Sequence, residues 1–175
     1  MDSHRERVSP LLEDHYSRID ERPRLRQILA TRIDANEDSE ERYGLHLRLA
    51  ALYAADEELE QQCEHLGRAF LIRPQDVTLL EQIEALTASL GRWPDFAGLL
   101  ERALPSVAQT SLEHAFRERL VTVYSEHHLR PAMAIAHLEA LLGNDPDHID
   151  WLKHVVELTR ALDNPAALAS ALERL

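Results

Sequence analysis

Apolar residues recur at three- and four-residue steps along most of the chain. Two consecutive stripes with this spacing are Leu45, Leu49, Leu52 and Tyr53, then Leu59, Cys63, Leu66, Ala69 and Phe70. Such a period predicts amphipathic α-helices that pair as hairpins. Each stripe is too narrow to be buried by its own hairpin, so we expect successive hairpins to stack.

Prolines and glycines mark where these helices begin and end. Proline falls in a predicted first turn, where its missing N–H costs nothing, at Pro10, Pro94, Pro131 and Pro165. Pro74 and Pro146 follow predicted helix ends. The expected helices lie near 9–19, 23–34, 38–54, 57–72, 76–90, 94–104, 110–126, 131–142, 147–161 and 165–175. They make one all-α domain over 9–175 after a tail at 1–8, with hairpins at about 9–34, 38–72, 76–104, 110–142 and 147–175.

The chain also repeats itself. A shift of 71 residues places Leu49 on Leu120 and Tyr53 on Tyr124, and a shift of 72 places His65-Leu66 on His137-Leu138 and Pro74 on Pro146. The step from 71 to 72 is expected in a helix–helix turn. A unit of this length is twice a two-helix repeat of about 34 residues.

The repeated positions resemble the tetratricopeptide repeat (TPR) family over essentially the whole chain from Ser9. The residues that carry the resemblance are His46, Leu49-Ala50, Tyr53, Leu66, Ala69 and Pro74, and in the second copy Leu120-Val121, Tyr124, Ala134, Leu138, Leu141 and Pro146. The resemblance implies a right-handed α-α superhelix, a TPR-like solenoid of about five hairpins. Strong and weak repeats alternate as in the degenerate arrays of large bacterial scaffold or regulatory proteins.

In TPR proteins the first helix of each hairpin lines a concave, peptide-binding side. The positions carried over on this resemblance are Leu47, Ala51, Ala54, Ala55, Glu81, Ala85, Ala88, Ser89, Glu118, Thr122, Ser125, Glu126, Lys153, Glu157 and Arg160. Two interpretations stay open: the small residues leave room for a partner, or they only let neighbouring helices approach. The family's carboxylate clamp is absent, since Leu47, Ala51 and Ala55 stand in its place, so an acidic chaperone tail is not an expected ligand.

Charge narrows the partner class. The 175-residue chain has 31 acidic against 19 basic residues, a net charge of −12, which disfavours nucleic acid and favours a basic partner. The densest basic cluster, Arg18, Arg22, Arg24, Arg26 and Arg32, is interpreted as a solvated helix face. No apolar run approaches the roughly 20 residues that span a bilayer, and no signal peptide is visible, so we expect a cytoplasmic protein without membrane insertion. Cys63, the single cysteine, is interpreted as a passive thiol.

No catalytic, cofactor or metal site is predicted. The five glycines form no phosphate-binding loop, and the ten histidines include no His-x-x-x-His or Glu-x-x-His pair. Asp150 and His154 lie one turn apart, but two ligands do not make a metal site. The histidines suggest a charge that changes near pH 6. Most aromatic residues are expected in the core, namely Tyr16, Tyr53, Phe70, Trp93, Phe116, Tyr124 and Trp151.

These features favour a scaffold or adaptor that binds a protein segment on a mildly acidic concave face. The alternative is a structural spacer or self-association module, because the last helix leaves Leu172 and Leu175 without a neighbour. A part of an enzyme is the remote third hypothesis; the expectation is that the chain is not an enzyme.

Overall fold

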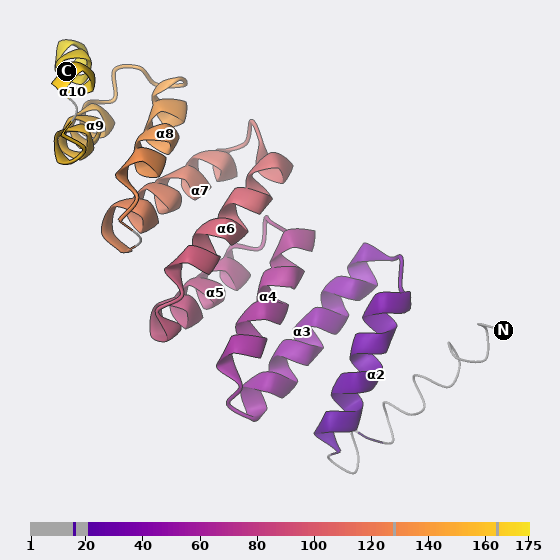
Figure 1. The fold of residues 1–175 in the computed structure, drawn as a ribbon. Coiled ribbons are helices and arrows are strands. Elements are labelled where there is room, and N and C mark those ends of the chain that lie inside the picture. Colours follow the sequence, from indigo (N-terminus) through magenta and orange to yellow (C-terminus); the bar gives the residue numbers. More distant parts are fainter. Residues whose placement is uncertain (1–15, 17–20, 128, 164) are drawn as a thin grey trace. The chain divides into compact units, whose positions relative to one another are not determined.

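A computed structural model describes residues 16, 21–127, 129–163 and 165–175 of the chain. Every regular element in this described part is helical, and none is a strand. In chain order the α-helices are α2 (Arg22–Ala35), α3 (Ser39–Ala55), α4 (Leu59–Ile72), α5 (Val77–Leu90), α6 (Trp93–Ala103), α7 (Ser111–Thr122), α8 (Pro131–Leu142), α9 (Ile149–Ala161) and α10 (Pro165–Arg174) (Figure 1). The predicted all-α fold class is confirmed.

The helix ends agree with the predicted ones within about two residues, except at the end of α7, because the end signals act locally. Asp38 lies just before α3, and its side chain accepts a hydrogen bond from the backbone N–H of Glu40 at 2.8 Å. Proline lies in the first turn of α2, α6 and α8. Gly91, with a φ of +65°, follows α5 in the left-handed region that favours glycine. The helix predicted at 9–19 lies almost entirely outside the described residues.

The chain divides into two compact units, Met1–Leu90 (unit 1) and Gly91–Leu175 (unit 2). The boundary falls between α5 and α6, inside the hairpin expected at 76–104, so the pairing of those two helices stays a prediction. The division into five hairpins likewise stays a prediction.

In unit 1, consecutive helices pack against each other in the order α2, α3, α4 and α5. The core between α2 and α3 consists of buried residues, Leu25, Leu29, Ile33, Leu45 and Leu49. Ala69 and Phe70 of α4 are fully buried. The predicted stripes therefore face inward except at Leu59, which is 38% exposed at the start of α4. The contact between α3 and α4 is the most extensive of the unit.

In unit 2, α8 packs against both α7 and α9, and α10 packs against α9. The core of this region contains Val121, Leu138, Leu142, Leu152, Val155, Val156 and Ala171. Between α6 and α7 lies a short 3-10 helix, Leu104–Val107. The last turn after α7 is a π-helix, η2 (Val123–His127), where the sequence predicted continuous α-helix to residue 126. A π-helix holds an extra residue per turn, and the extra residue that changes the repeat shift from 71 to 72 falls between Tyr124 and His137.

Candidate functional site

The predicted partner-binding residues of unit 1 lie on the surface of α3 and α5. On α3, Ala51 and Ala55 are exposed and Leu47 and Ala54 are half-buried, while Leu49 two residues from Leu47 is buried in the core. On α5 all four predicted residues are exposed, namely Glu81, Ala85, Ala88 and Ser89. Both helices contact α4. Tyr43, near the start of α3, donates a hydrogen bond to the carboxylate of Asp76, just before α5, at 2.7 Å.

The predicted residues of unit 2 lie on the surface of α7, η2 and α9. Six of them are exposed, Glu118, Thr122, Glu126, Lys153, Glu157 and Arg160, and Ser125 is half-buried. The Ser125 hydroxyl lies 3.4 Å from Nε2 of His154, which links η2 to α9. Both α7 and α9 pack against α8, so the two first helices of this unit are held by one shared neighbour.

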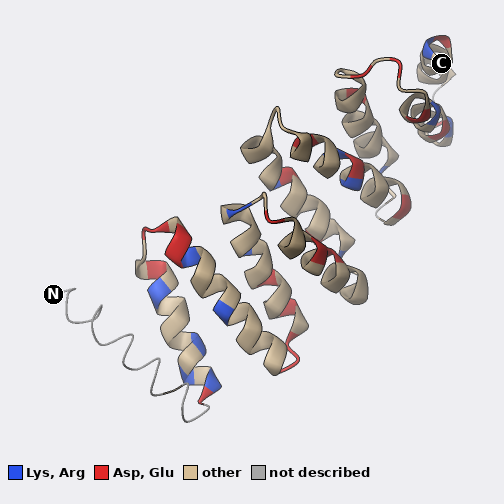
Figure 2. Cartoon of the chain, turned by 180° about the vertical axis from the view of Figure 1, so that it is seen from behind, with Lys and Arg blue, Asp and Glu red and all other residues tan. Residues whose placement is uncertain are grey.

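Acidic side chains on these surfaces are available to a partner. Within the described residues, Glu81, Glu118 and Glu157 have no cation in ion-pair range. Lys153 does pair, with Asp150 one turn earlier at 3.6 Å. Coloured by charge, the described residues of α2 and α3 carry several basic positions, whereas acidic residues occur in both units (Figure 2).

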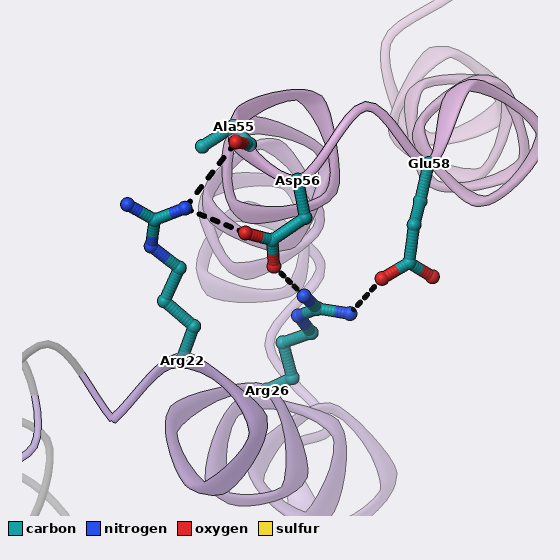
Figure 3. Close-up of polar contacts among 5 residues, drawn as sticks. All are labelled: Arg22, Arg26, Ala55, Asp56 and Glu58. Atoms are coloured by element: carbon teal, nitrogen blue, oxygen red, sulfur yellow. Dashed lines mark hydrogen bonds and ion pairs between the residues drawn. The ribbon is translucent and has the colours of Figure 1, made fainter.

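An ion cluster beside Ala55 was not predicted from the sequence. Arg22 donates to the backbone carbonyl of Ala55 at 3.2 Å and to Asp56 at 2.5 Å, and Arg26 pairs with both Asp56 and Glu58, the latter at 2.6 Å (Figure 3). Four charges thus tie α2 to the turn between α3 and α4. The available signals were the acidic run 56–58 directly after α3 and the two arginines spaced by four residues, Arg22 and Arg26, on α2.

The interpretation of the basic cluster as a solvated face is therefore wrong for most of its described members. The Arg26 side chain is only 17% exposed, and its guanidinium lies 4.5 Å from the centre of the Tyr53 ring. Arg32 pairs with Glu41 on α3. Arg24 is exposed and pairs with the nearby Glu21, and Arg18 lies outside the described residues.

A stacked tyrosine–histidine pair lies inside each unit. In unit 1 the ring centres of Tyr53 and His65 are 5.3 Å apart and nearly parallel, and the Nδ1 atoms of His46 and His65 are 3.1 Å apart. Burial, aided by the neighbouring His65, Arg68 and Arg42, lowers the pKa of His46 to about 4. Burial also lowers the pKa of His65.

In unit 2 the corresponding rings, Tyr124 and His137, stack with centres 5.8 Å apart. The Tyr124 hydroxyl donates to the Glu101 carboxylate at 2.5 Å. Burial, together with that carboxylate, raises the pKa of Tyr124 to about 12. His137 Nδ1 lies 3.4 Å from the Arg117 guanidinium, and burial followed by that cation lowers the pKa of His137.

Three of the seven aromatic residues predicted in the core are buried. Phe70 and Phe116 are fully buried and Tyr124 is buried as expected, whereas Tyr16, Tyr53, Trp93 and Trp151 are half-buried. Cys63 is half-buried, with its sulfur 3.8 Å from the Thr87 hydroxyl. In the part of the chain that the structure covers, no three metal-ligating side chains converge, and no helix has the length and apolar character needed to cross a membrane.

No protein-family model matches the sequence, and no curated protein matches it significantly. Among solved structures, a MamA RS-1 ArsTM double mutant is 11% identical, with 97% of this chain and 92% of that chain covered and a TM-score of 0.45. MamA 41-end from Desulfovibrio magneticus RS-1 is 12% identical, with 97% and 90% covered and a TM-score of 0.45. A Podosopora anserina kinesin light chain with TPR-like repeats is 17% identical, with 96% and 90% covered and a TM-score of 0.44.

The helices of the chain show the features of the predicted helical repeat. Their lengths, the packing of consecutive helices within each unit and the inward-facing positions Leu49, Ala50 and Leu66, with Leu120, Ala134 and Leu138, follow the pattern that the sequence predicted. The chain is an all-α array of TPR-like helical hairpins.

Proposed function

We propose that this chain is a protein-interaction module in which the first helices of each unit, α3 and α5 in unit 1 and α7 and α9 in unit 2, present a mildly acidic surface to a basic segment of a partner protein. The observation that supports this most is the division of these helices into two faces. Their large apolar residues pack inward, while Ala51, Ala85 and Ala88 are exposed.

That exposure bears on the interpretation left open by the sequence. If the small residues served only close helix packing, they would be covered by a neighbouring helix of the same unit. Ala51 and Ala55 on α3, and Ala85 and Ala88 on α5, are instead accessible. Small exposed side chains leave room for a partner's side chains or helix.

The charge of the same face favours a basic partner. Glu81 on α5 and Glu157 on α9 have no ion-pair partner among the described residues, and the net charge of −12 draws cationic segments toward the chain. Lys153 and Arg160 moderate this charge on α9, which is why the face is described as mildly acidic.

The test is binding of the full chain to a displayed peptide library that contains basic, neutral and acidic segments. Basic peptides should be enriched, and Glu81→Lys and Glu157→Lys should each weaken their binding about threefold to tenfold, more at low salt. The matched control is Glu173→Lys, which makes the same charge change at an exposed glutamate of α10, a helix that is not one of the first helices. Selective enrichment of acidic C-terminal peptides, or equal weakening by the control, would contradict the proposal.

Self-association is the second candidate, because Leu172 and Leu175 at the end of α10 are 49% and 53% exposed. Sedimentation at several protein concentrations distinguishes the two functions. Self-association predicts a mass that rises with concentration and falls again in Leu172→Glu, whereas the interaction-module proposal predicts a constant mass.

A further inference from the structure

Two imidazoles meet inside unit 1 where α3 packs against α4. His46 comes from α3 and is 2% exposed, and His65 comes from α4. Their Nδ1 atoms face each other at 3.1 Å, a hydrogen-bond distance. His65 also stacks against Tyr53, and the guanidinium of Arg26 on α2 lies 4.5 Å from the centre of the Tyr53 ring. The pair therefore lies in the contact between α3 and α4, and Tyr53 connects it to Arg26 of α2.

This geometry limits how many protons the pair can hold. A hydrogen bond between two ring nitrogens needs one N–H and one lone pair, so the accepting imidazole must be neutral. If both rings were cations, each Nδ1 would carry a hydrogen and the two would repel each other at this distance. The contact between α3 and α4 is thus compatible with one charged imidazole at most.

The surrounding charges come from each helix that packs against the pair. Arg42 on α3 and Arg68 on α4 disfavour added positive charge, whereas Asp34 on α2 and Glu64 on α4 favour it. Among the described residues, α5 contributes the carboxylates Glu81 and Glu84, and neither is among the charges that shift these two imidazoles. Burial is the largest influence on both rings, so their surroundings favour the neutral forms.

We propose that the His46–His65 pair is a proton-sensitive contact that holds the α3–α4 hairpin closed at neutral pH and releases it on acidification. A proton that binds the accepting Nδ1 removes its lone pair, which breaks the bond between the two rings. The first helix of this hairpin, α3, then loses its buried polar contact with α4. This device is independent of which partner the surface binds.

The sign of the effect follows from where the protons bind. The ordinary pKa of histidine is about 6.5, and the folded unit lowers it. Below that ordinary value the unfolded chain binds more protons than the folded one. The contribution of the two rings to the stability of unit 1 is therefore fully present above about pH 6.5. It is lost as the pH falls toward the pKa values of the folded state.

The test is hydrogen exchange of the α3 and α4 amides in the full chain at about pH 7.5 and about pH 5, corrected for intrinsic exchange rates. Protection should fall by about 30-fold through His46 alone. The double variant His46→Asn, His65→Asn keeps a donor and an acceptor near the two Nδ1 positions but cannot titrate, and its protection should change far less. The matched control His114→Asn removes an imidazole of unit 2 that contacts Asn144 and should leave the loss in α3 and α4 unchanged. An equal loss in the wild type and the double variant would overturn the proposal.

A second measurement covers the case in which the double variant does not fold. Nuclear magnetic resonance titration of the wild-type rings should show His46 and His65 charging below the ordinary histidine range, with loss of α3–α4 protection in the same pH interval. Protonation of both rings with the hairpin still fully protected would overturn the proposal.

Discussion

Units 1 and 2 contain the same ring pair with different third partners. Tyr53 and His65 stack in unit 1, Tyr124 and His137 stack in unit 2, and the sequence repeat aligns these two pairs. A shift of 71 places Arg117 at the position of His46, so the contact with histidine Nδ1 comes from an imidazole in one unit and a guanidinium in the other.

This difference indicates the protonation state of the stacked histidine. Because a guanidinium can only donate, His137 Nδ1 must accept and the ring is neutral with its hydrogen on Nε2. That Nε2 is buried without a hydrogen-bond partner and lies 4.0 Å from the Glu101 carboxylate. In unit 1 the donor is itself titratable. Both units therefore need a neutral histidine, but only the contact in unit 1 can change its donor with pH.

The largest expected effect tests whether the two cores are equivalent. Phe70 in unit 1 and Phe116 in unit 2 are both fully buried. Phe70→Ala and Phe116→Ala should each lower the stability of its own unit by about 3–5 kcal/mol, because each leaves a cavity. Hydrogen exchange of each unit measures this. Both tryptophans of the chain, Trp93 and Trp151, lie in unit 2, so tryptophan fluorescence reports that unit alone. A loss of stability below 1 kcal/mol in either variant would contradict the full burial of that phenylalanine.

The next effect concerns the ion cluster of unit 1. In unit 2 the shift of 71 places the buried Ala97 at the position of Arg26, so the central arginine of the cluster has no equivalent there. Arg26→Ala removes the pairs with Asp56 and Glu58 and the contact with the Tyr53 ring, and should cost about 1–3 kcal/mol in urea unfolding. Arg24→Ala is the control, because it removes an exposed local pair with Glu21 and a 5.5 Å contact with the Tyr16 ring; it should cost less than about 0.5 kcal/mol. Equal costs would mean that the cluster adds no more than a surface pair.

A substitution can convert one unit toward the other. His46→Arg gives unit 1 the donor found in unit 2 and leaves one titrating ring in the contact. The acid-induced loss of α3–α4 protection should then shrink to that of α7 and α8, as measured by hydrogen exchange at about pH 7.5 and about pH 5. An undiminished loss would show that the acid sensitivity of unit 1 arises outside the His46–His65 pair.

The smallest effect separates the two tyrosines. Tyr124→Phe leaves the Glu101 carboxylate without its donor and should cost about 1 kcal/mol. Tyr53→Phe should cost almost nothing, since no hydrogen bond of the Tyr53 hydroxyl occurs among the described residues. Ultraviolet titration adds a check, because the Tyr124 hydroxyl should ionise only near its raised pKa of about 12. A larger loss of stability in Tyr53→Phe than in Tyr124→Phe would contradict the assignment of the stabilising hydrogen bond to the Tyr124 hydroxyl.

The sequence predicted the helices but missed the polar interior, for a physical reason. Apolar spacing and proline act over a few neighbours, so positions such as Leu49 and Pro131 reveal a local face or a local start. The His46–His65 contact joins residues on two helices, and it needs the hairpin to exist before the rings meet. His46 lies three residues before Leu49, which places it toward the apolar stripe; that was the available signal.

The predicted partner-binding positions and their surroundings show the same limit. Their exposure follows from the helical period, because residues such as Ala51 lie away from the buried stripe. The ion cluster at Asp56 does not, because it depends on how α2 lies against the turn between α3 and α4. The π-helix after α7 was indicated only by the extra residue in the second repeat, and that residue was expected in the turn.

The most direct measurement is the nitrogen chemical shifts of the His46, His65 and His137 imidazoles at neutral pH. The comparison of the two units predicts that His137 is neutral with its hydrogen on Nε2, and that one shared Nδ1 hydrogen lies between His46 and His65. A hydrogen on Nδ1 of His137, or positive charge on both rings of the unit 1 pair at neutral pH, would contradict it.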